Sequence, residues 1–106
     1  MTEIVPVRGV VYRADAGHGL KPFLVVSNNA RNQKLDDCLA VRLTTTPKPD
    51  LPSIVKLGPA DAGLVGAVLC DDIVVLYRDE LRETLGALSP TTMVKVAAGL
   101  RAALAL

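Results

Sequence analysis

Short apolar runs alternate with polar or glycine-rich segments along most of the chain. The runs are rich in β-branched residues and are too short for ordinary helices, which is typical of strands. Arg42 interrupts one of them and is therefore predicted on a solvent-facing position. The pattern predicts strands over residues 8–14, 22–26, 38–43, 53–57, 67–70, 73–76 and 81–88.

The connections between these runs carry turn and loop signals. Three prolines within residues 47–52 exclude regular strand pairing there. The acidic pair Asp71-Asp72 predicts a break between two strands. The other predicted connections are the glycine-containing loop 15–19, the polar surface loop 27–34 and the turn 58–63.

The last part of the sequence has apolar residues at the spacing of a helix, not in the short runs typical of strands. Ser89 is a good N-cap, and Pro90 suits the first position of a helix, where its missing N–H costs nothing. Apolar residues then recur at helical spacing, which predicts one helix with a single apolar face that packs against the sheet. That face consists of Met93, Val96, Ala97, Leu100 and Leu104.

Several short strands followed by one helix define the expected fold class. The chain has 106 residues and a mass of 11.2 kDa, so residues 1–106 are expected to form one domain. Short strands avoid exposed edges when the sheet closes on itself. We therefore expect a mainly β protein, a small SH3-like antiparallel barrel with a C-terminal α-helix.

Composition excludes several classes of protein. Half of the residues are hydrophobic and only 22% are charged, which argues against intrinsic disorder. Because no apolar run reaches the length of a bilayer span and the first residues do not resemble an export signal, we expect a cytoplasmic protein without membrane contact. The net charge is +1, but residues 1–60 carry eight Lys or Arg against five Asp or Glu. This basic half could face nucleic acid, although so small a surplus is more often a solvated surface.

The metal-ligating residues are few. Cys38 and Cys70 are the only cysteines and His18 is the only histidine, so thiol and imidazole groups cannot complete a four-ligand zinc site. No metal or other cofactor is expected. Both cysteines lie in apolar runs, where we expect buried free thiols rather than a disulfide.

Two motifs have both a structural and a functional interpretation. His18 lies between two glycines and is either a surface loop residue or a group that transfers protons near neutral pH. The run Thr44-Thr45-Thr46 is either the polar end of a strand or part of a site. Taken alone, each motif fits the structural interpretation better.

The order of five segments along the chain is more specific than any one of them. In this order they resemble the MazF/PemK family of toxin endoribonucleases, and the similarity runs from about residue 8 to about residue 104. The segments are Arg8-Gly9-Val10-Val11-Tyr12, Lys21 to Asn28, Val41 to Thr46, Val68 to Ile73, and Leu85 to Pro90.

The resemblance implies a metal-independent endoribonuclease that cuts single-stranded RNA at short sequences. In such a reaction the 2′-hydroxyl attacks the adjacent phosphate and leaves a cyclic phosphate and a free 5′-hydroxyl. The implied catalytic residues are Lys21 and Thr44, with His18 as a candidate for proton transfer. Most relatives carry arginine at the lysine position, and lysine offers phosphate a point charge rather than a planar fork.

The resemblance also implies RNA contacts and protein partners. A neighbouring cation could support Lys21, and Arg13 and Arg31 are the candidates. Asp72 stands where relatives often carry an amide that meets a base, and its carboxylate could accept from the exocyclic amine of cytosine. The expected RNA-binding residues are Arg13, Asn28, Arg31, Thr45 and Asp72.

The implied assembly is a homodimer that is bound by a cognate antitoxin protein. Two alternatives share the same fold. One is a CcdB-type toxin that binds gyrase and has no nuclease site, and the other is an inactive RNA-binding barrel. A groove that contains both Lys21 and Thr44 distinguishes the nuclease from these alternatives.

Overall fold

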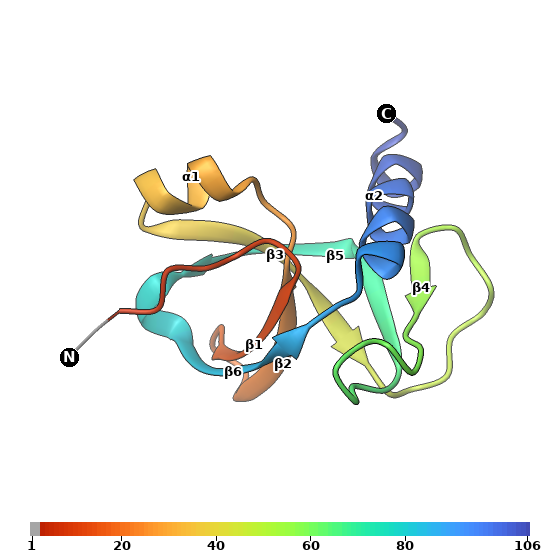
Figure 1. Cartoon of the computed structure of the whole chain (residues 1–106), viewed down its shortest axis with the longest axis horizontal. Coiled ribbons are helices and arrows are strands. Elements are labelled where there is room, and N and C mark those ends of the chain that lie inside the picture. Colours follow the sequence, from red (N-terminus) through yellow and green to blue (C-terminus); the bar gives the residue numbers. More distant parts are fainter. Residues whose placement is uncertain (1–2) are drawn as a thin grey trace.

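A computed structural model describes residues 3–106 as one six-stranded antiparallel sheet with two α-helices and a short 3₁₀-helix, η1 (Figure 1). Residues 1 and 2 of the predicted domain lie outside the described residues. The strand order is β4-β5-β3-β2-β1-β6. The elements are β1 (Val10–Asp15), β2 (Leu20–Val25), α1 (Asn29–Lys34), β3 (Asp37–Thr44), β4 (Ile54–Lys56), β5 (Ala67–Tyr77), η1 (Arg78–Glu80), β6 (Leu81–Ala87) and α2 (Pro90–Leu104).

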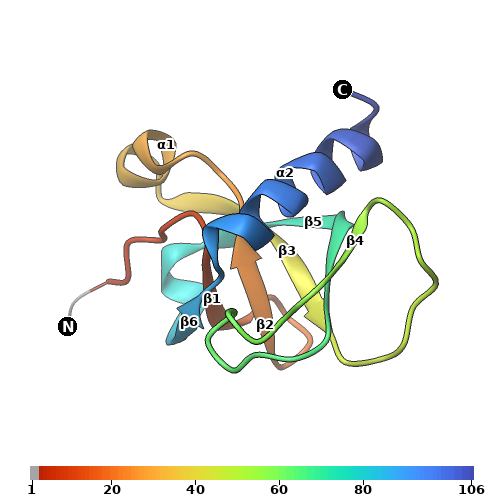
Figure 2. The ribbon, with the colours of Figure 1, turned by 45° about the vertical axis from the view of Figure 1, so that its right-hand side comes forward.

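The two faces of the sheet bury separate apolar clusters. Side chains alternate between the faces along each strand, so Val11 and Leu24 belong to one cluster, and Tyr12 and Phe23 to the other. The first cluster is covered by α2, whose Val96 is fully buried (Figure 2). The second is enclosed by the sheet as it curls, with Leu76 and Leu81 contributed by β5 and β6.

Helix α2 begins as its sequence predicts. The Ser89 hydroxyl oxygen accepts a hydrogen bond from the Thr92 N–H (3.1 Å), and Pro90 is the first helical residue. Met93 and Leu100 pack against the first cluster. Leu104, predicted on the apolar face, is instead 53% exposed, because the last turn of α2 extends past the sheet (Figure 2).

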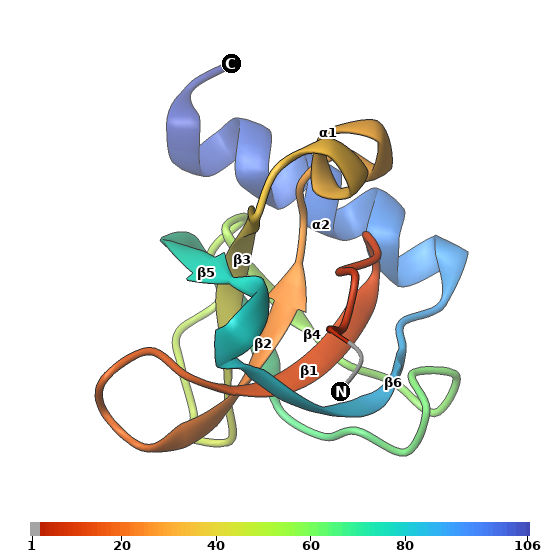
Figure 3. The ribbon, with the colours of Figure 1, turned by 90° about the vertical axis from the view of Figure 1, so that its left-hand side faces the viewer.

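The sheet is strongly curved but open. The expected mainly β fold with a C-terminal helix is confirmed, whereas closure of the barrel is not. Strands β4 and β6 form the two edges, and among the described residues they do not pair with each other (Figure 3). Edge strand β4 has only three residues, which limits the unpaired backbone that this open edge exposes.

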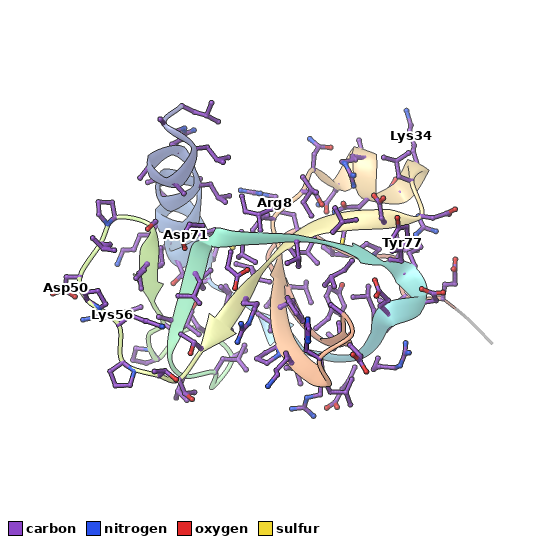
Figure 4. The ribbon with its side chains drawn as sticks, turned by 180° about the vertical axis from the view of Figure 1, so that it is seen from behind. Arg8, Lys34, Asp50, Lys56, Asp71 and Tyr77 are labelled. Atoms are coloured by element: carbon purple, nitrogen blue, oxygen red, sulfur yellow. The ribbon has the colours of Figure 1, made fainter. Side chains whose placement is uncertain are left out.

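Strand β5 corrects the predicted break at the acidic pair. It is continuous, but Leu69 pairs with Arg42 while Ile73 pairs with Val41, so three residues of β5 have no partner on β3. Extra residues on one strand bend it and increase its twist. Figure 4 shows β5 turning a corner at Asp71. The two strands predicted from the sequence are therefore the two arms of one bent strand.

Helix α1 replaces part of the predicted surface loop. The Asn28 side chain caps it by accepting hydrogen bonds from the N–H groups of Ala30 (2.8 Å) and Arg31 (3.3 Å). Asn32 is fully buried and donates to the Ser27 carbonyl (3.0 Å), and the Arg78 side chain donates to the Asn32 carbonyl (2.8 Å). Polar contacts rather than apolar periodicity stabilise this helix, so the hydrophobic pattern did not predict it.

Both cysteines are buried free thiols, as expected. Burial raises the pKa of Cys38 and that of Cys70 to about 11, so both remain protonated at neutral pH. Gly99 of α2 lies directly over Cys70, where an added Cβ would be 2.7 Å from the Cys70 sulfur. The glycine therefore lets the helix approach β5 closely.

A buried carboxylate joins the β4–β5 loop to the start of α2. Asp61 accepts hydrogen bonds from the N–H groups of Gly58 (2.8 Å) and Ser89 (2.9 Å) and from the Thr92 hydroxyl (2.9 Å). Burial opposes ionisation of this group, but the hydrogen bonds outweigh burial and hold its pKa below the ordinary value. Asp61 thus fixes the loop against the helix.

We expect Asp61→Asn to lower the free energy of unfolding at pH 7 by about 1–3 kcal/mol, because an amide N–H₂ would face N–H donors. Since the pKa is lower in the folded state, this stabilisation is complete above the unfolded pKa and is lost as pH falls through the folded one. Urea unfolding at pH 7 and pH 3 measures both effects. The exposed Asp36 provides the control, and equal midpoints for Asp36→Asn and Asp61→Asn at pH 7 would contradict the prediction.

Candidate active site

A proline ends the pairing between β2 and β3 and opens the candidate site. The Val26 N–H donates to the Leu39 carbonyl on the β3 side (2.9 Å), and alternation along the strand directs the backbone of Pro22 to the same side. Pro22 has no N–H to donate. The register runs from Val25 and Ala40 to Phe23 and Arg42, where it stops. Beyond this point the two strands line a cavity.

This cavity has a volume of about 510 Å³ and brings together four of the predicted site residues: Lys21, Arg13, Thr44 and Thr45. Lys21 comes from β2, Arg13 from β1, and the threonines from the end of β3. The β4–β5 loop forms the opposite wall. The full lining is Arg13, Lys21, Pro22, Arg42, Leu43, Thr44, Thr45, Thr46, Gly63, Leu64, Val65 and Leu85.

Thr44 is held in place by close backbone contact. Gly66 adopts a positive φ of 105°, and a Cβ there would lie 2.2 Å from the Thr44 carbonyl oxygen, so only glycine fits. The Thr44 hydroxyl oxygen accepts a hydrogen bond from the Thr46 N–H (3.1 Å). This bond leaves the hydroxyl hydrogen free to be donated to a ligand in the cavity.

The cavity has a positive lining. Lys21, Arg13 and Arg42 line it, and none of its described lining residues is acidic. Two carboxylates approach two of these cations. Arg13 bonds to Glu83 (3.1 Å), and Arg42 lies 3.6 Å from Asp72. The combination of three cations with threonine hydroxyl groups suits a phosphate-containing ligand.

A smaller hollow of about 230 Å³ continues from the cavity across the threonines. Thr44, Thr45 and Thr46 line both spaces, and the second also contains Lys48 and Lys56. Lys56 bonds to Asp50 (2.9 Å), and both lie at the β4 end of the molecule (Figure 4). The threonines therefore line two hollows, and each hollow also has cations in its lining.

The structure does not bring the other predicted residues into the cavity. Asn28 and Arg31 belong to α1, where Asn28 is the N-cap and Arg31 bonds to Asp37 (2.8 Å). Asp72 does not line the cavity, but it forms an ion pair with Arg42, which does. His18 is exposed in the β1–β2 loop, three residues before Lys21, and is not a lining residue.

Sequence reasoning missed one cation. Arg42 was predicted on a solvent-facing position, and its side chain is 43% exposed, but its place in the lining of the cavity was not predicted. The signal was present in the strand alternation, which places residues 42 and 44 of β3 on the same face. The β4–β5 loop and Leu85 were also missed, because only the tertiary fold brings them to this site.

A larger hollow, of about 610 Å³, lies between α2 and the segment around β4. It is lined by residues such as Leu51, Pro52 and Ala98 and contains none of the predicted site residues. Size alone would favour it, but the convergence of cations and hydroxyl groups favours the cavity at Lys21 and Thr44. We therefore assign the candidate active site to the cavity of about 510 Å³ that contains Lys21 and Thr44.

Residues 3–106 contain neither a cluster of metal ligands nor a helix that could span a membrane. No group of three or more His, Cys, Asp or Glu side chains in this range is placed to hold a metal ion. Neither α-helix of the described chain has the length and apolar character needed to cross a membrane.

The fold and the cavity define a small mainly β protein with a basic surface site, and sequence comparison identifies its family. A match to the family described as PemK-like, MazF-like toxin of type II toxin-antitoxin system spans residues 5–104. The chain belongs to this family. The resemblance seen in the sequence is confirmed.

Individual relatives cover nearly the whole chain. Endoribonuclease MazF1 of Mycobacterium bovis and Endoribonuclease MazF4 of Mycobacterium tuberculosis are each 50% identical over 101 residues, which are 95% of this chain and 94% of the relative. A solved mycobacterial endoribonuclease in complex with its cognate antitoxin has a TM-score of 0.90 at 50% identity, covering 95% of this chain and 96% of that one. A MazE-MazF structure from Deinococcus radiodurans has a TM-score of 0.82 at 28% identity, covering 98% and 99%.

Proposed function

We propose that this protein is the toxin of a bacterial toxin–antitoxin pair and acts as an endoribonuclease on single-stranded RNA, most often messenger RNA. The observation that carries the proposal is that Lys21 and Thr44, which are 23 positions apart in the sequence, line one basic cavity in a member of the PemK and MazF family. The similarity to proteins named endoribonucleases supports it.

The proposed reaction needs no metal. The RNA 2′-oxygen forms a bond to the adjacent phosphorus while the bond from phosphorus to the 5′-oxygen breaks. One proton leaves the 2′-hydroxyl and one is delivered to the departing 5′-oxygen, which gives a cyclic phosphate and a 5′-hydroxyl. Catalysis then rests on cations and hydrogen-bond donors near the non-bridging oxygens, where negative charge increases.

Each proposed catalytic residue has a defined part in this reaction. The Lys21 ammonium neutralises charge on the phosphate, and the Thr44 hydroxyl donates a hydrogen bond to a non-bridging oxygen. His18 is the candidate for moving a proton. It lies on a loop in which the Asp15 carboxylate accepts hydrogen bonds from the N–H groups of Gly17 (2.8 Å) and Gly19 (3.2 Å).

The proposed RNA contacts extend beyond the reacting phosphate. Arg13 and Thr45 contact RNA inside the cavity, and Asp72 does so at its border. Asn28 and Arg31, which stabilise α1, contact only RNA that passes over β3 towards that helix. Three aromatic residues in the whole chain are too few for a stacking platform, so charge dominates RNA binding.

We propose a homodimer that binds a cognate antitoxin in the cytoplasm, where its RNA substrate is found, with residues 1–106 forming one domain. Relatives solved as antitoxin complexes support the partner. Exposed apolar side chains on β5 and α2 offer surface for protein contacts, and they include Val75, Tyr77, Val94 and Leu104.

The two alternatives receive less support. A CcdB-type toxin would bind gyrase and would not need Lys21 and Thr44 in one cavity, and an inactive barrel would not need a free threonine hydroxyl beside a cation. The structure brings these groups together. The nuclease is therefore the proposal that the geometry favours.

Purified protein should cleave total RNA in the presence of excess EDTA, because the proposed steps use only protein groups. Mapping of new 5′-hydroxyl ends on the products measures both the activity and its chemistry. A strict need for magnesium, or products with 5′-phosphates, would overturn the mechanism.

Lys21→Ala should lower the cleavage rate by about two to three orders of magnitude while the thermal midpoint stays near that of the wild type, because a charge aimed at the transition state is removed. Lys21→Arg should keep or raise the rate, since it retains the charge. Single-turnover cleavage of one mapped RNA site measures the rates. Lys34→Ala, which removes an exposed lysine of α1, is the matched control. Equal rates for Lys21→Ala and Lys34→Ala would move the catalytic role to another cation.

His18→Ala should lower the rate roughly a hundredfold and change the shape of the pH profile of cleavage, because it removes the proposed proton-transfer group. Single-turnover profiles from about pH 5 to pH 9 test this, and superimposable profiles would show that His18 is only a loop residue.

A further inference from the structure

We propose that Arg42 is a second phosphate-binding cation of the cavity and that Asp72 positions its guanidinium group. The inference rests on the proposed function, because it concerns how the same cavity holds RNA. It assigns to Arg42 the planar, two-oxygen contact with phosphate that Lys21, as a point charge, does not supply.

The sheet places Arg42 beside both proposed catalytic residues. It lies two positions before Thr44 on β3, so the two side chains project from the same face. Arg42 pairs with Phe23 at the end of the β2–β3 register, and Lys21 lies two positions from Phe23 on β2. Lys21 and Arg42 are therefore diagonal neighbours on one face, and both line the cavity.

The guanidinium group of Arg42 has donors without acceptors. Its Nε atom is buried and has no hydrogen-bond partner among the described residues. Its Nη1 atom lies 3.6 Å from the Asp72 carboxylate, which is an ion pair but too long for a hydrogen bond. Buried polar groups are rarely left unpaired, because the loss of hydration costs free energy. The side chain as a whole is 43% exposed, so a phosphate in the cavity would supply acceptors for the exposed donors of the guanidinium group.

The two arginines predicted to support Lys21 already have acceptors. The Arg13 guanidinium donates a hydrogen bond to Glu83 (3.1 Å). Arg31 donates to both the carboxylate (2.8 Å) and the carbonyl (3.1 Å) of Asp37, on the side of β3 next to α1. Arg13 and Arg31 were the cations expected to support Lys21. The geometry favours Arg42 as the cation that supports Lys21.

The bend of β5 accounts for the place of Asp72. Asp72 is one of the three residues of β5 that have no partner on β3, and this unpaired segment lies next to Arg42 in the register. The bulge re-aims a side chain that a regular ladder would place elsewhere. Asp72 therefore meets the guanidinium from the β5 side, which leaves the cavity side for RNA.

The test measures binding and cleavage separately. A short RNA containing a mapped cleavage site is prepared with a 2′-deoxy nucleotide at that site, so that it binds but does not react. Its affinity is measured over a range of salt concentrations, because each phosphate contact contributes about 0.7 to the slope of log K against log salt for a single strand. The unmodified RNA gives the cleavage rate.

Arg42→Ala and Arg42→Gln should each reduce the salt slope by about 0.7 and the cleavage rate by about a hundredfold. Arg42→Lys keeps the charge, so it should keep the slope, yet it should lose at least about tenfold in rate because the planar fork is absent. Arg101→Ala, an exposed arginine of α2 outside the cavity, is the control and should match the wild type.

Asp72→Asn separates a positioning role from a direct contact with a base. Loss of the carboxylate should lower kcat while RNA binding stays equal or becomes tighter, because a negative charge has left the site. Weaker binding with unchanged kcat would assign Asp72 to base contact and would overturn its positioning role.

The outcomes distinguish this inference from the proposed function. If the wild type does not cleave RNA in EDTA, the proposed function fails. If the wild type cleaves, and the Arg42 variants keep its salt slope and its rate within about threefold, only the inference about Arg42 is overturned. If Arg42→Ala fails to fold, Arg42→Gln and Arg42→Lys give the same comparison of slope and rate.

Discussion

The bend in β5 is the constraint on which the rest of the architecture depends. Between Leu69 and Ile73 this strand has three residues that β3 does not pair, so its two arms run in different directions (Figure 4). The first arm contributes Val68 and Cys70 to the cluster under α2. The second contributes Leu76 to the cluster on the opposite face. One strand thereby closes two small cores, which a flat sheet of this length would leave exposed.

The candidate site lies where regular pairing ends. Pro22 cannot donate to β3, so β2 and β3 separate there, and the end of β3 is held instead from the other side by Gly66. Asp61 fixes the loop that forms the opposite wall by accepting hydrogen bonds from the start of α2. The cavity is therefore bounded by rigid backbone on each side. Such a frame suits a reaction that depends on position and charge.

Charge is the principal means by which this site can act on RNA. The lining has three cations, and the two nearest carboxylates, those of Glu83 and Asp72, approach their arginines from outside it. A phosphate that gains negative charge during reaction would meet positive charge already held in place. Because Arg13 and Arg42 are oriented by ion pairs with Glu83 and Asp72 before the substrate arrives, two of the three cations need little reorganisation during the reaction.

Local sequence determined most of the elements. Alternation and β-branched runs predicted the strands, and Ser89 with Pro90 predicted the start of α2, because these signals act within a few residues. Family resemblance added Lys21 and Thr44, which share the cavity. Short-range patterns missed α1, because a buried asparagine and a distant arginine, Arg78, stabilise that helix.

Tertiary structure alone decided the rest. Asp71 and Asp72 predicted a break between two strands. Pairing with β3 on both sides of the acidic pair instead makes β5 one strand that bends there. The same register places the partly exposed Arg42 in the lining of the cavity beside Lys21, which its solvent-facing position in the sequence pattern did not indicate. Composition and periodicity describe each strand by itself. Which side chains meet across strands depends on register. The register depends on where the bulge of β5 falls and on where Pro22 ends the pairing of β2 with β3, and both are seen only in the assembled sheet.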